Sequence, residues 1–371
     1  MKGWLTYILS WPIVFALGCG GLVDGGHLAR PRSEDAAASK YVMKVKRVQT
    51  FDHVHKGSFS RDGSRLAVMD QSYAEIISAA SGQKLSRLAP RDSTFLGISF
   101  SPDARLLASA LRSTKPADSL SIRVSLLEAE SGKEKLTLPT IDDDWRRPLD
   151  DLSFSPDGRL LVSNIGGIAR QWDVTSGKEV QRFVPETGPK DQQAERALLS
   201  SDGNLLAVYF ISPTKSEYKT VHIWNLETGQ QKKFETEIYL DWRFSGDSKL
   251  LVLTAIADKG KPTERSVAEI WDAVAASRLR VIELPKDWRG AYTVAFSPDS
   301  RLLAIGGYRK FGIFSVDTGE LLASETHHSG RLWQDSEMAN QLNHVEFSPD
   351  AKLLLTSGDD NTVKLWSIER R

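Results

Sequence analysis

The chain has 371 residues, of which 40% are hydrophobic and 26% are charged, a composition typical of a globular protein. Its 48 basic and 48 acidic side chains cancel, so the overall charge provides no field for capturing nucleic acid or anionic lipid. At this length a single hydrophobic core usually divides, whereas a repeat architecture escapes that limit because each unit packs only on its neighbours.

The first 18 residues are typical of a signal peptide rather than of a folded element. Lys2 is followed by an apolar run over 4–17, whose 14 residues fall short of the roughly 20 that a membrane-spanning helix needs. The run ends in Ala-Leu-Gly-Cys at 16–19, which resembles the bacterial lipobox, although Ala16 stands where that motif usually has leucine. In proteins with this motif the cysteine is lipidated and becomes the mature N-terminus.

Cys19 is the only cysteine of the chain. It could be an incidental thiol, but it stands where this export signal needs a cysteine, and no second cysteine is present to form an internal disulfide. We therefore expect lipidation of Cys19 to hold the protein at the cell envelope, outside the cytoplasm, since several acyl chains together anchor stably. Simple secretion and an uncleaved anchor are the alternatives. The sequence leaves open whether the inner or the outer membrane is used.

Residues 19–40 are rich in glycine, proline and mixed charge and have no apolar period. This composition predicts a flexible, lipid-anchored linker before a folded domain at 41–371. The next stretch, 42–51, alternates apolar and basic residues, as expected for a β-strand, and lies before the first complete copy of a repeated unit.

The clearest copy of that unit runs from Asn343 to Glu369. Its three short apolar runs place apolar side chains two residues apart, as on one face of a strand. The first turn, at 348–351, reads Ser-Pro-Asp-Ala, in which proline presets φ and serine bonds back to the backbone. The second turn, at 358–361, reads Gly-Asp-Asp-Asn and tolerates the dihedral angles of a tight reversal.

The Ser-x-Asp turn recurs at intervals of 41 to 54 residues, near the repeat length of about 40–45 for a four-stranded propeller blade. Its seven copies begin at Ser60, Ser101, Ser155, Ser200, Ser245, Ser297 and Ser348. The last unit ends at Arg371, almost directly after its third strand, so it lacks a fourth strand of its own. We predict that Lys44 to Thr50 supplies this outer strand and closes a ring of blades.

These features resemble the WD-repeat (WD40) β-propeller family over Val42 to the C-terminus. The third strand ends in tryptophan in four units, and a Ser-Gly or Thr-Gly pair marks the turn into the fourth strand. The tryptophans are Trp172, Trp224, Trp271 and Trp366, and the glycines are Gly82, Gly132, Gly177, Gly229 and Gly319. The resemblance implies an all-β fold, a seven-bladed β-propeller of four-stranded antiparallel blades. The family's Gly-His dipeptide is missing before the first strands, which predicts that the hydrogen-bond network of a typical blade lacks its histidine.

Long loops are predicted on one rim, where the connections into first strands and between second and third strands meet. Three of them carry tryptophan beside arginine, the residue types most enriched at interface hot spots. The predicted partner-binding residues are Trp145, Arg146, Arg147, Trp288, Arg289, Arg331 and Trp333. Alternatively, each tryptophan folds back over its blade edge and each arginine pairs with a nearby aspartate. Trp242 also lies between aspartate and arginine but occupies a first-strand core position, so the tripeptide alone is not specific.

The sequence predicts neither a metal site nor a catalytic site, and no cofactor. Five histidines precede the first strands of two neighbouring blades: His53, His55, His327, His328 and His344. Their spacing matches no zinc-ligand pattern, and nearby carboxylates can pair with them. The acidic run at 142–144 lacks the further ligands of a calcium loop. A nucleophile elbow, a zinc-protease motif, a phosphate loop and a cysteine nucleophile are all missing.

We therefore expect a non-catalytic, monomeric, lipid-anchored propeller that acts as an interaction platform for another protein. Its membrane contact would be through the lipid alone, and nucleic acid is not an expected partner. A second hypothesis is a periplasmic enzyme or ligand-binding propeller, such as a sugar-binding one, with its site in the central channel. A third is a structural component of the envelope without a discrete partner.

Overall fold

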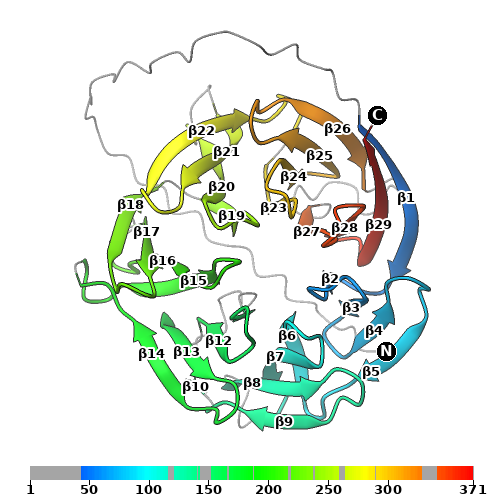
Figure 1. Ribbon diagram of the computed structural model, residues 1–371, viewed down its shortest axis with the longest axis vertical. Coiled ribbons are helices and arrows are strands. Elements are labelled where there is room, and N and C mark those ends of the chain that lie inside the picture. The colour runs from blue at the N-terminus through cyan, green and yellow to red at the C-terminus, as the bar shows by residue number, and fades with distance from the viewer. Residues whose placement is uncertain are drawn as a thin grey trace, which may run out of the picture. The chain divides into compact units, whose positions relative to one another are not determined.

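The computed structural model describes residues 43–370, apart from 116–120, 140, 143–151, 165–166, 187, 216–218, 237–238, 259–263, 289 and 328–340. Across these described residues the regular elements are all strands, which form seven antiparallel sheets around a central axis (Figure 1). The predicted all-β, seven-bladed propeller is therefore confirmed. None of the described residues forms a helix long and apolar enough to cross a membrane.

Blades 1 to 3 run outward from the axis in chain order. Their strands are β2 (Lys56–Phe59), β3 (Arg65–Met69), β4 (Ala74–Ser78) and β5 (Lys84–Leu88); β6 (Ser93–Phe100), β7 (Leu106–Ser113), β8 (Ser121–Glu128), β9 (Glu134–Thr137) and β10 (Ile141–Asp142); and β11 (Ser153–Phe154), β12 (Leu160–Ser163), β13 (Ala169–Asp173) and β14 (Glu179–Phe183). In blade 2 both β9 and β10 pair with β8, so two short strands share its outer position.

Blades 4 to 6 repeat the same order. Their strands are β15 (Gln193–Leu199), β16 (Leu205–Ile211), β17 (Lys219–Asn225) and β18 (Gln231–Glu235); β19 (Tyr239–Phe244), β20 (Leu250–Ala257), β21 (Arg265–Asp272) and β22 (Ser277–Glu283); and β23 (Thr293–Phe296), β24 (Leu302–Gly306), β25 (Lys310–Ser315) and β26 (Leu321–Thr326).

Blade 7 joins the two ends of the propeller. Its first three strands are β27 (Leu342–Phe347), β28 (Leu353–Gly358) and β29 (Thr362–Arg370), and its outer strand is β1 (Met43–Asp52) from the start of the described chain. The two outer strands pair antiparallel from Met43 opposite Arg370 to Asp52 opposite Thr362, with a bulge between Arg47 and Gln49. The predicted ring closure by Lys44 to Thr50 is confirmed.

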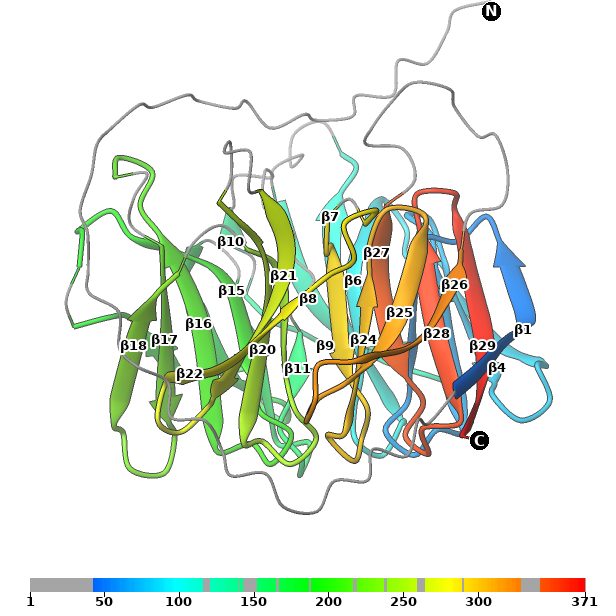
Figure 2. The same ribbon diagram turned by 90° about the horizontal axis from the view of Figure 1, so that it is seen from above.

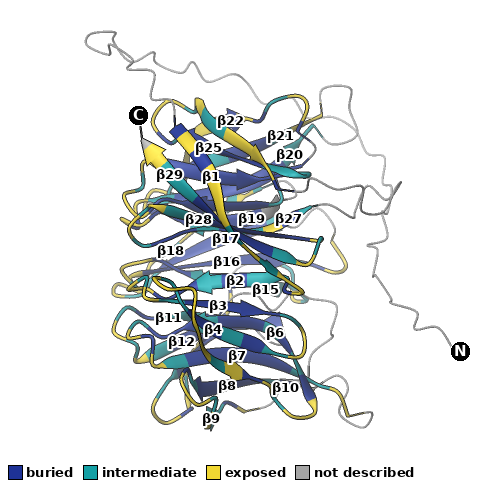
Figure 3. Ribbon diagram, turned by 90° about the vertical axis from the view of Figure 1, so that its right-hand side faces the viewer, coloured by how far each residue is buried: buried dark blue, intermediate teal, exposed yellow. Residues whose placement is uncertain are grey.

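Apolar packing lies between blades rather than inside one central core. Seven buried clusters among the described residues each draw side chains from two neighbouring blades. One, for example, joins Leu88 of blade 1 to Phe95 of blade 2. Exposed residues collect instead on outer strands such as β22 and β1 (Figure 3). The fold therefore needs no single large core, because apolar side chains are buried separately at each of the seven blade interfaces.

The Ser-x-Asp turns have one geometry in all seven blades. Each serine hydroxyl donates to the aspartate Oδ1 at 2.6 to 2.7 Å and accepts from the backbone N–H five residues on at 2.9 Å. The hydrogen bond from Ser60 is the largest factor lowering the pKa of Asp62. Strands run between this rim and the opposite one (Figure 2). The turns therefore anchor every first-to-second strand reversal.

A buried ion network joins three blades near the axis. Asp241 of β19 is 5% exposed and receives hydrogen bonds from Arg196 of β15 at 2.8 Å and Arg243 at 2.7 Å. Its other oxygen accepts from Thr293 and the Val294 N–H of β23 at 3.1 and 3.0 Å. Burial alone would raise the pKa of Asp241, but the two arginines hold that pKa at about 2. The carboxylate therefore stays ionised and ties blades 4, 5 and 6 together.

Candidate partner-binding sites

Most of the predicted functional residues lie outside the described part of the chain. These are Cys19, Trp145, Arg146, Arg147, Arg289, Arg331 and Trp333. Among the described residues, segments that enter first strands bond to turns between second and third strands. The Val54 N–H donates to the Asn361 carbonyl at 3.1 Å, and Phe95 donates to Gln71 at 2.8 Å. The two sets of connections share one rim, as the sequence predicted.

Trp288 is the predicted contact residue that the structure does place. It is 6% exposed and packs edge-on against Phe314, with the ring centroids 6.0 Å apart. The ammonium of Lys310 lies 5.5 Å from its ring, and Lys310 also pairs with Asp287. A Cβ on Gly312 would lie 2.8 Å from the indole, so the absence of a side chain there makes room for it. Trp288 thus takes the alternative arrangement, folded back over its blade and not open to a partner.

His327 corrects the expectation that the blade network lacks its histidine. Its side chain is buried, and Nδ1 lies 2.7 Å from Thr356 Oγ1, which also accepts from Trp366 Nε1–H at 2.7 Å. On its other side Nε2 lies 3.4 Å from Asp360, which receives a hydrogen bond from Lys364 at 3.0 Å. The histidine of blade 7 is present but precedes β27 by many residues, so a Gly-His search at the strand cannot find it.

The rim histidines do not form a metal site among the residues that are described. His344 lies 3.2 Å from Glu346, and His327 is committed to its threonine and aspartate, in line with the local carboxylate pairing that the sequence allowed. His328 lies in the segment outside the description.

The central channel is lined by side chains from the first strands of all seven blades and holds a cavity of about 380 Å³. Its charged residues are Lys56, Arg243, His344 and Glu346, among serines and apolar side chains. Glu346 accepts from the Phe59 N–H at 3.2 Å, which joins blade 7 to blade 1. Because Arg243 pairs with Asp241 and His344 lies beside Glu346, the channel has mixed charge and suits a small polar molecule.

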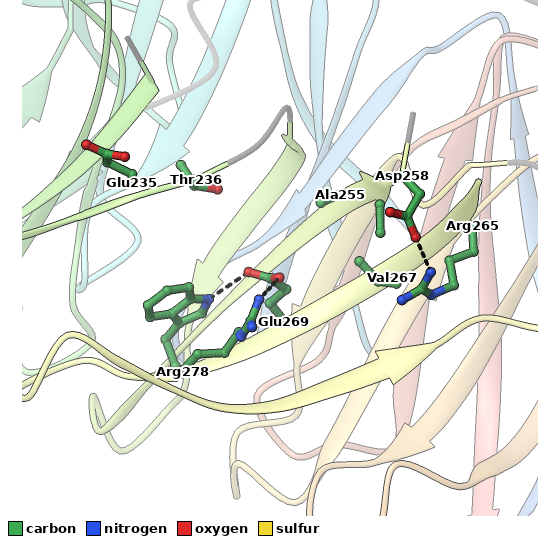
Figure 4. Close-up of a pocket in the computed structure, with 10 residues that line it drawn as sticks. Glu235, Thr236, Ala255, Asp258, Arg265, Val267, Glu269 and Arg278 are labelled. Carbon is green, nitrogen blue, oxygen red and sulfur yellow. Dashed lines mark hydrogen bonds and ion pairs between the residues drawn. The ribbon is translucent and has the colours of Figure 1, made fainter. Parts of the chain in front are cut away.

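A groove of about 630 Å³ lies between blades 4 and 5 (Figure 4). Trp271 of β21 stacks on Phe234 of β18 with centroids 3.9 Å apart. Glu269 accepts from Trp271 Nε1–H at 3.1 Å and from Arg278 at 2.7 Å. At the other end Arg265 pairs with Asp258 and Glu283. Both arginines that line this groove are thus neutralised by carboxylates of the same blade.

A second groove, of about 460 Å³, lies between blades 1 and 2. The end of β5 and the residues after it form one wall, from Arg87 to Arg91, and Leu111 of β7 with Arg123 and Leu127 of β8 form the other. Sequence reasoning missed both grooves. Their residues come from neighbouring blades, so predicting either groove from the sequence would require the register of every strand pair.

The comparisons with known proteins agree with this architecture. A family model described as WD domain, G-beta repeat matches residues 336–367, which include β27 and β28 and most of β29. The COMPASS component SWD3 of Saccharomyces cerevisiae is 24% identical over 216 residues, which cover 57% of this chain and 62% of the yeast protein. WD repeat-containing protein 3 of Homo sapiens is 23% identical over 215 residues, covering 58% of this chain and 20% of the human protein.

The fold is a seven-bladed β-propeller, and a WD-repeat model matches its last blade. The chain spans less than two thirds of the length of either relative. The yeast protein is by its name a component of COMPASS, and the human protein is by its name one that contains WD repeats.

Proposed function

We propose that this protein is a non-catalytic scaffold that binds another protein and is held at the cell envelope by a lipid on Cys19. The observation that supports binding is the ring itself. Seven blade interfaces and the Asp241 network fix the blades, and a closed outer strand leaves the rim loops on a rigid frame. The sequence similarity to the yeast COMPASS component SWD3 also supports a role in binding another protein.

The binding proposal is tested by crosslinking in the native cell followed by purification of the full-length protein. The double variant W145A/W333A should lose the crosslinked partner, because both tryptophans belong to the predicted contact loops. W288A is the matched control: it removes a buried ring, so it should lower stability by about 3–5 kcal/mol at most while sparing the partner in the folded fraction. Full recovery of the partner by W145A/W333A would contradict these loops as the contact.

The lipid proposal rests on the sequence Ala-Leu-Gly-Cys at 16–19 after an apolar run. Mass spectrometry of the mature protein should find an acylated Cys19 at the N-terminus. The variant C19S should move from the membrane fraction to the soluble fraction, whereas substitution in the linker, such as S33A, should leave the distribution unchanged. An unmodified mature N-terminus at any other residue would contradict lipidation.

The channel supports a second candidate function, binding of a small polar ligand. Its cavity of about 380 Å³ is lined by Lys56, Arg243, His344 and Glu346, and this volume falls within the range of about 300–1,000 Å³ typical of ligand sites. Native mass spectrometry of the protein purified from its own cells would show a bound small molecule. Loss of that molecule in K56A/H344A would favour this candidate over the scaffold.

A further inference from the structure

The two interblade grooves occupy the same place in the propeller, as the strand registers show. Across β7 and β8 Leu111 pairs with Arg123, and across β20 and β21 Ala255 pairs with Val267. Arg123 stands four residues before Leu127, and Val267 stands four residues before Trp271. Leu127 and Trp271 hold the same position near the end of their third strands. Arg123 therefore stands in blade 2 where blade 5 has valine.

The other end of each groove also corresponds. Leu127 pairs with Glu134 in blade 2, and Trp271 pairs with Arg278 in blade 5. Leu127 and Glu134 thus stand in blade 2 where blade 5 has Trp271 and Arg278. The walls of the groove between blades 1 and 2 instead carry Arg87, Arg91 and Arg123.

That positive charge is only partly balanced within the part of the chain that is described. Arg87 lies 4.0 Å above the Tyr73 ring and 3.9 Å from Glu75, which pairs more closely with Lys84 at 2.6 Å. No described carboxylate pairs with Arg91 or Arg123. Glu134, the carboxylate of this groove, accepts a hydrogen bond from the Ser125 hydroxyl at 3.0 Å.

The floor of the same groove is apolar. Leu88, Leu111 and Leu127 are 2%, 1% and 6% exposed, and Pro90 continues the wall beside them. Gly132 has a φ of +70°, and a Cβ there would lie 2.7 Å from Leu88, so a larger residue would close this end. The result is an apolar trough with guanidinium groups at its margin.

We infer that this groove binds a short acidic segment of the partner protein, in which carboxylates flank an apolar side chain. Guanidinium groups bind carboxylates through paired, charge-assisted hydrogen bonds. Arg91 and Arg123 can form such bonds with a ligand, because no described carboxylate pairs with them. The leucine floor receives the apolar side chain. Three arginines on a protein of zero net charge do not provide the extended basic track that a nucleic acid needs. This inference rests on the proposed scaffold function and names the chemistry of one contact.

The test uses the full-length protein and a fluorescein-labelled peptide of nine residues in which aspartate and leucine alternate. Fluorescence anisotropy should show binding that weakens as salt is added, and at least tenfold weaker binding to R91E/R123E. The matched control is R105E/R159E, which makes the same charge change at two exposed turn arginines, 85% and 83% open to solvent, and should weaken binding less than twofold. Equal melting temperatures of the two variants would show that both remain folded.

Three outcomes would overturn the inference. They are equal loss of binding in both double variants, equal binding of a peptide with asparagine in place of aspartate, and binding that appears only after Asp142, Asp143 and Asp144 are changed to asparagine. The last would make the chain's own acidic run the occupant. If R91E/R123E keeps every crosslinked partner in the native cell while W145A/W333A loses them, the groove is not the contact and the scaffold function stands. If neither variant loses a partner, the proposed contact surfaces both fail.

Discussion

In the groove between blades 4 and 5 Glu269 accepts hydrogen bonds from Trp271 and Arg278, whereas between blades 1 and 2 the corresponding third-strand positions are Ser125 and Leu127. Both third strands have a register shift just before Trp271 or Leu127, and the fourth strand begins after the same kind of turn. Both arginines of the first groove pair with carboxylates, whereas in the second groove no described carboxylate pairs with Arg91 or Arg123. A repeated fold therefore supplies a series of equivalent positions, and a few side chains decide which of them is a structural contact.

The same two interfaces also differ in the first strands, near the axis of the propeller. Between blades 4 and 5 Arg196 pairs with the buried Asp241, whereas Lys56 and Gly97 hold the corresponding register positions between blades 1 and 2. The interface between blades 4 and 5 thus has an ion pair near the axis. The interface between blades 1 and 2 has its ion pair elsewhere, from Arg65 to Glu130 at 2.9 Å, beside an apolar cluster that includes Leu88 and Phe95.

Removing β1 should have the largest effect, because both interfaces depend on a closed ring. Deletion of residues 41–51 strips blade 7 of its outer strand and exposes the whole edge of β29. We expect the cooperative thermal transition to be lost. Deletion of the linker segment 20–30 is the control and should leave the melting temperature unchanged, and an equally unchanged value for the first deletion would contradict closure by β1.

Asp241→Asn should have the next largest effect and should act on the interface between blades 4 and 5. Arg196 and Arg243 would keep their charge without the carboxylate, a change that costs about 3–5 kcal/mol when an ion pair is buried. Urea unfolding would measure the loss, and exposed Asp317→Asn should stay within about 0.5 kcal/mol.

The pH profile gives an independent check on Asp241. Its folded pKa of about 2 lies below the ordinary value of 3.8, so its stabilisation is fully present above pH 3.8 and is lost as the pH falls through about 2. The asparagine variant should lack this component of acid sensitivity. Identical acid profiles for the two proteins would contradict a buried, ionised Asp241.

A smaller effect is expected at Glu269, on the outer side of the same interface. Glu269→Ala leaves Trp271 Nε1–H and the Arg278 guanidinium without their acceptor, at a cost of about 1–3 kcal/mol. Ser125→Ala changes the corresponding position of blade 2, where a neutral hydroxyl is removed, and should cost about 1 kcal/mol. Chemical unfolding of both variants compares the two grooves directly, and a larger loss for the serine variant would reverse the comparison.

The smallest effect on stability should come from R91Q/R123Q. Since neither arginine pairs with a described carboxylate, the free energy of unfolding should change by less than about 0.5 kcal/mol. The same measurement on Arg278→Gln, whose partner is Glu269 at 2.7 Å, should show a clear loss. Equal losses would mean that the groove between blades 1 and 2 is neutralised like its counterpart.

The fold was predictable because its signals are local. Each Ser-x-Asp turn is a few residues long and uses the same hydroxyl and backbone bonds in every blade. The pairing of β1 with β29 followed from counting strands, since the last unit lacked one that the alternating stretch at 42–51 could supply.

The candidate sites were harder to predict because they depend on which way a side chain points and on residues that are far apart in the sequence. The loop around Trp288 has a typical interface composition, yet the side chain turns inward where Gly312 leaves space on another strand. His327 reaches its network from well before β27. Arg91 and Arg123 lie on neighbouring blades, and no motif marks their shared groove.

The antiparallel pairing of Met43 with Arg370 places the two ends of the propeller side by side on adjacent strands. The order of the blades is therefore cyclic, and the place where the chain is cut is independent of how the blades pack. A circular permutant that joins these ends through a short linker and opens a turn such as the one at Gly229, where a Cβ would meet nothing within 4 Å, retains every strand pairing of the ring.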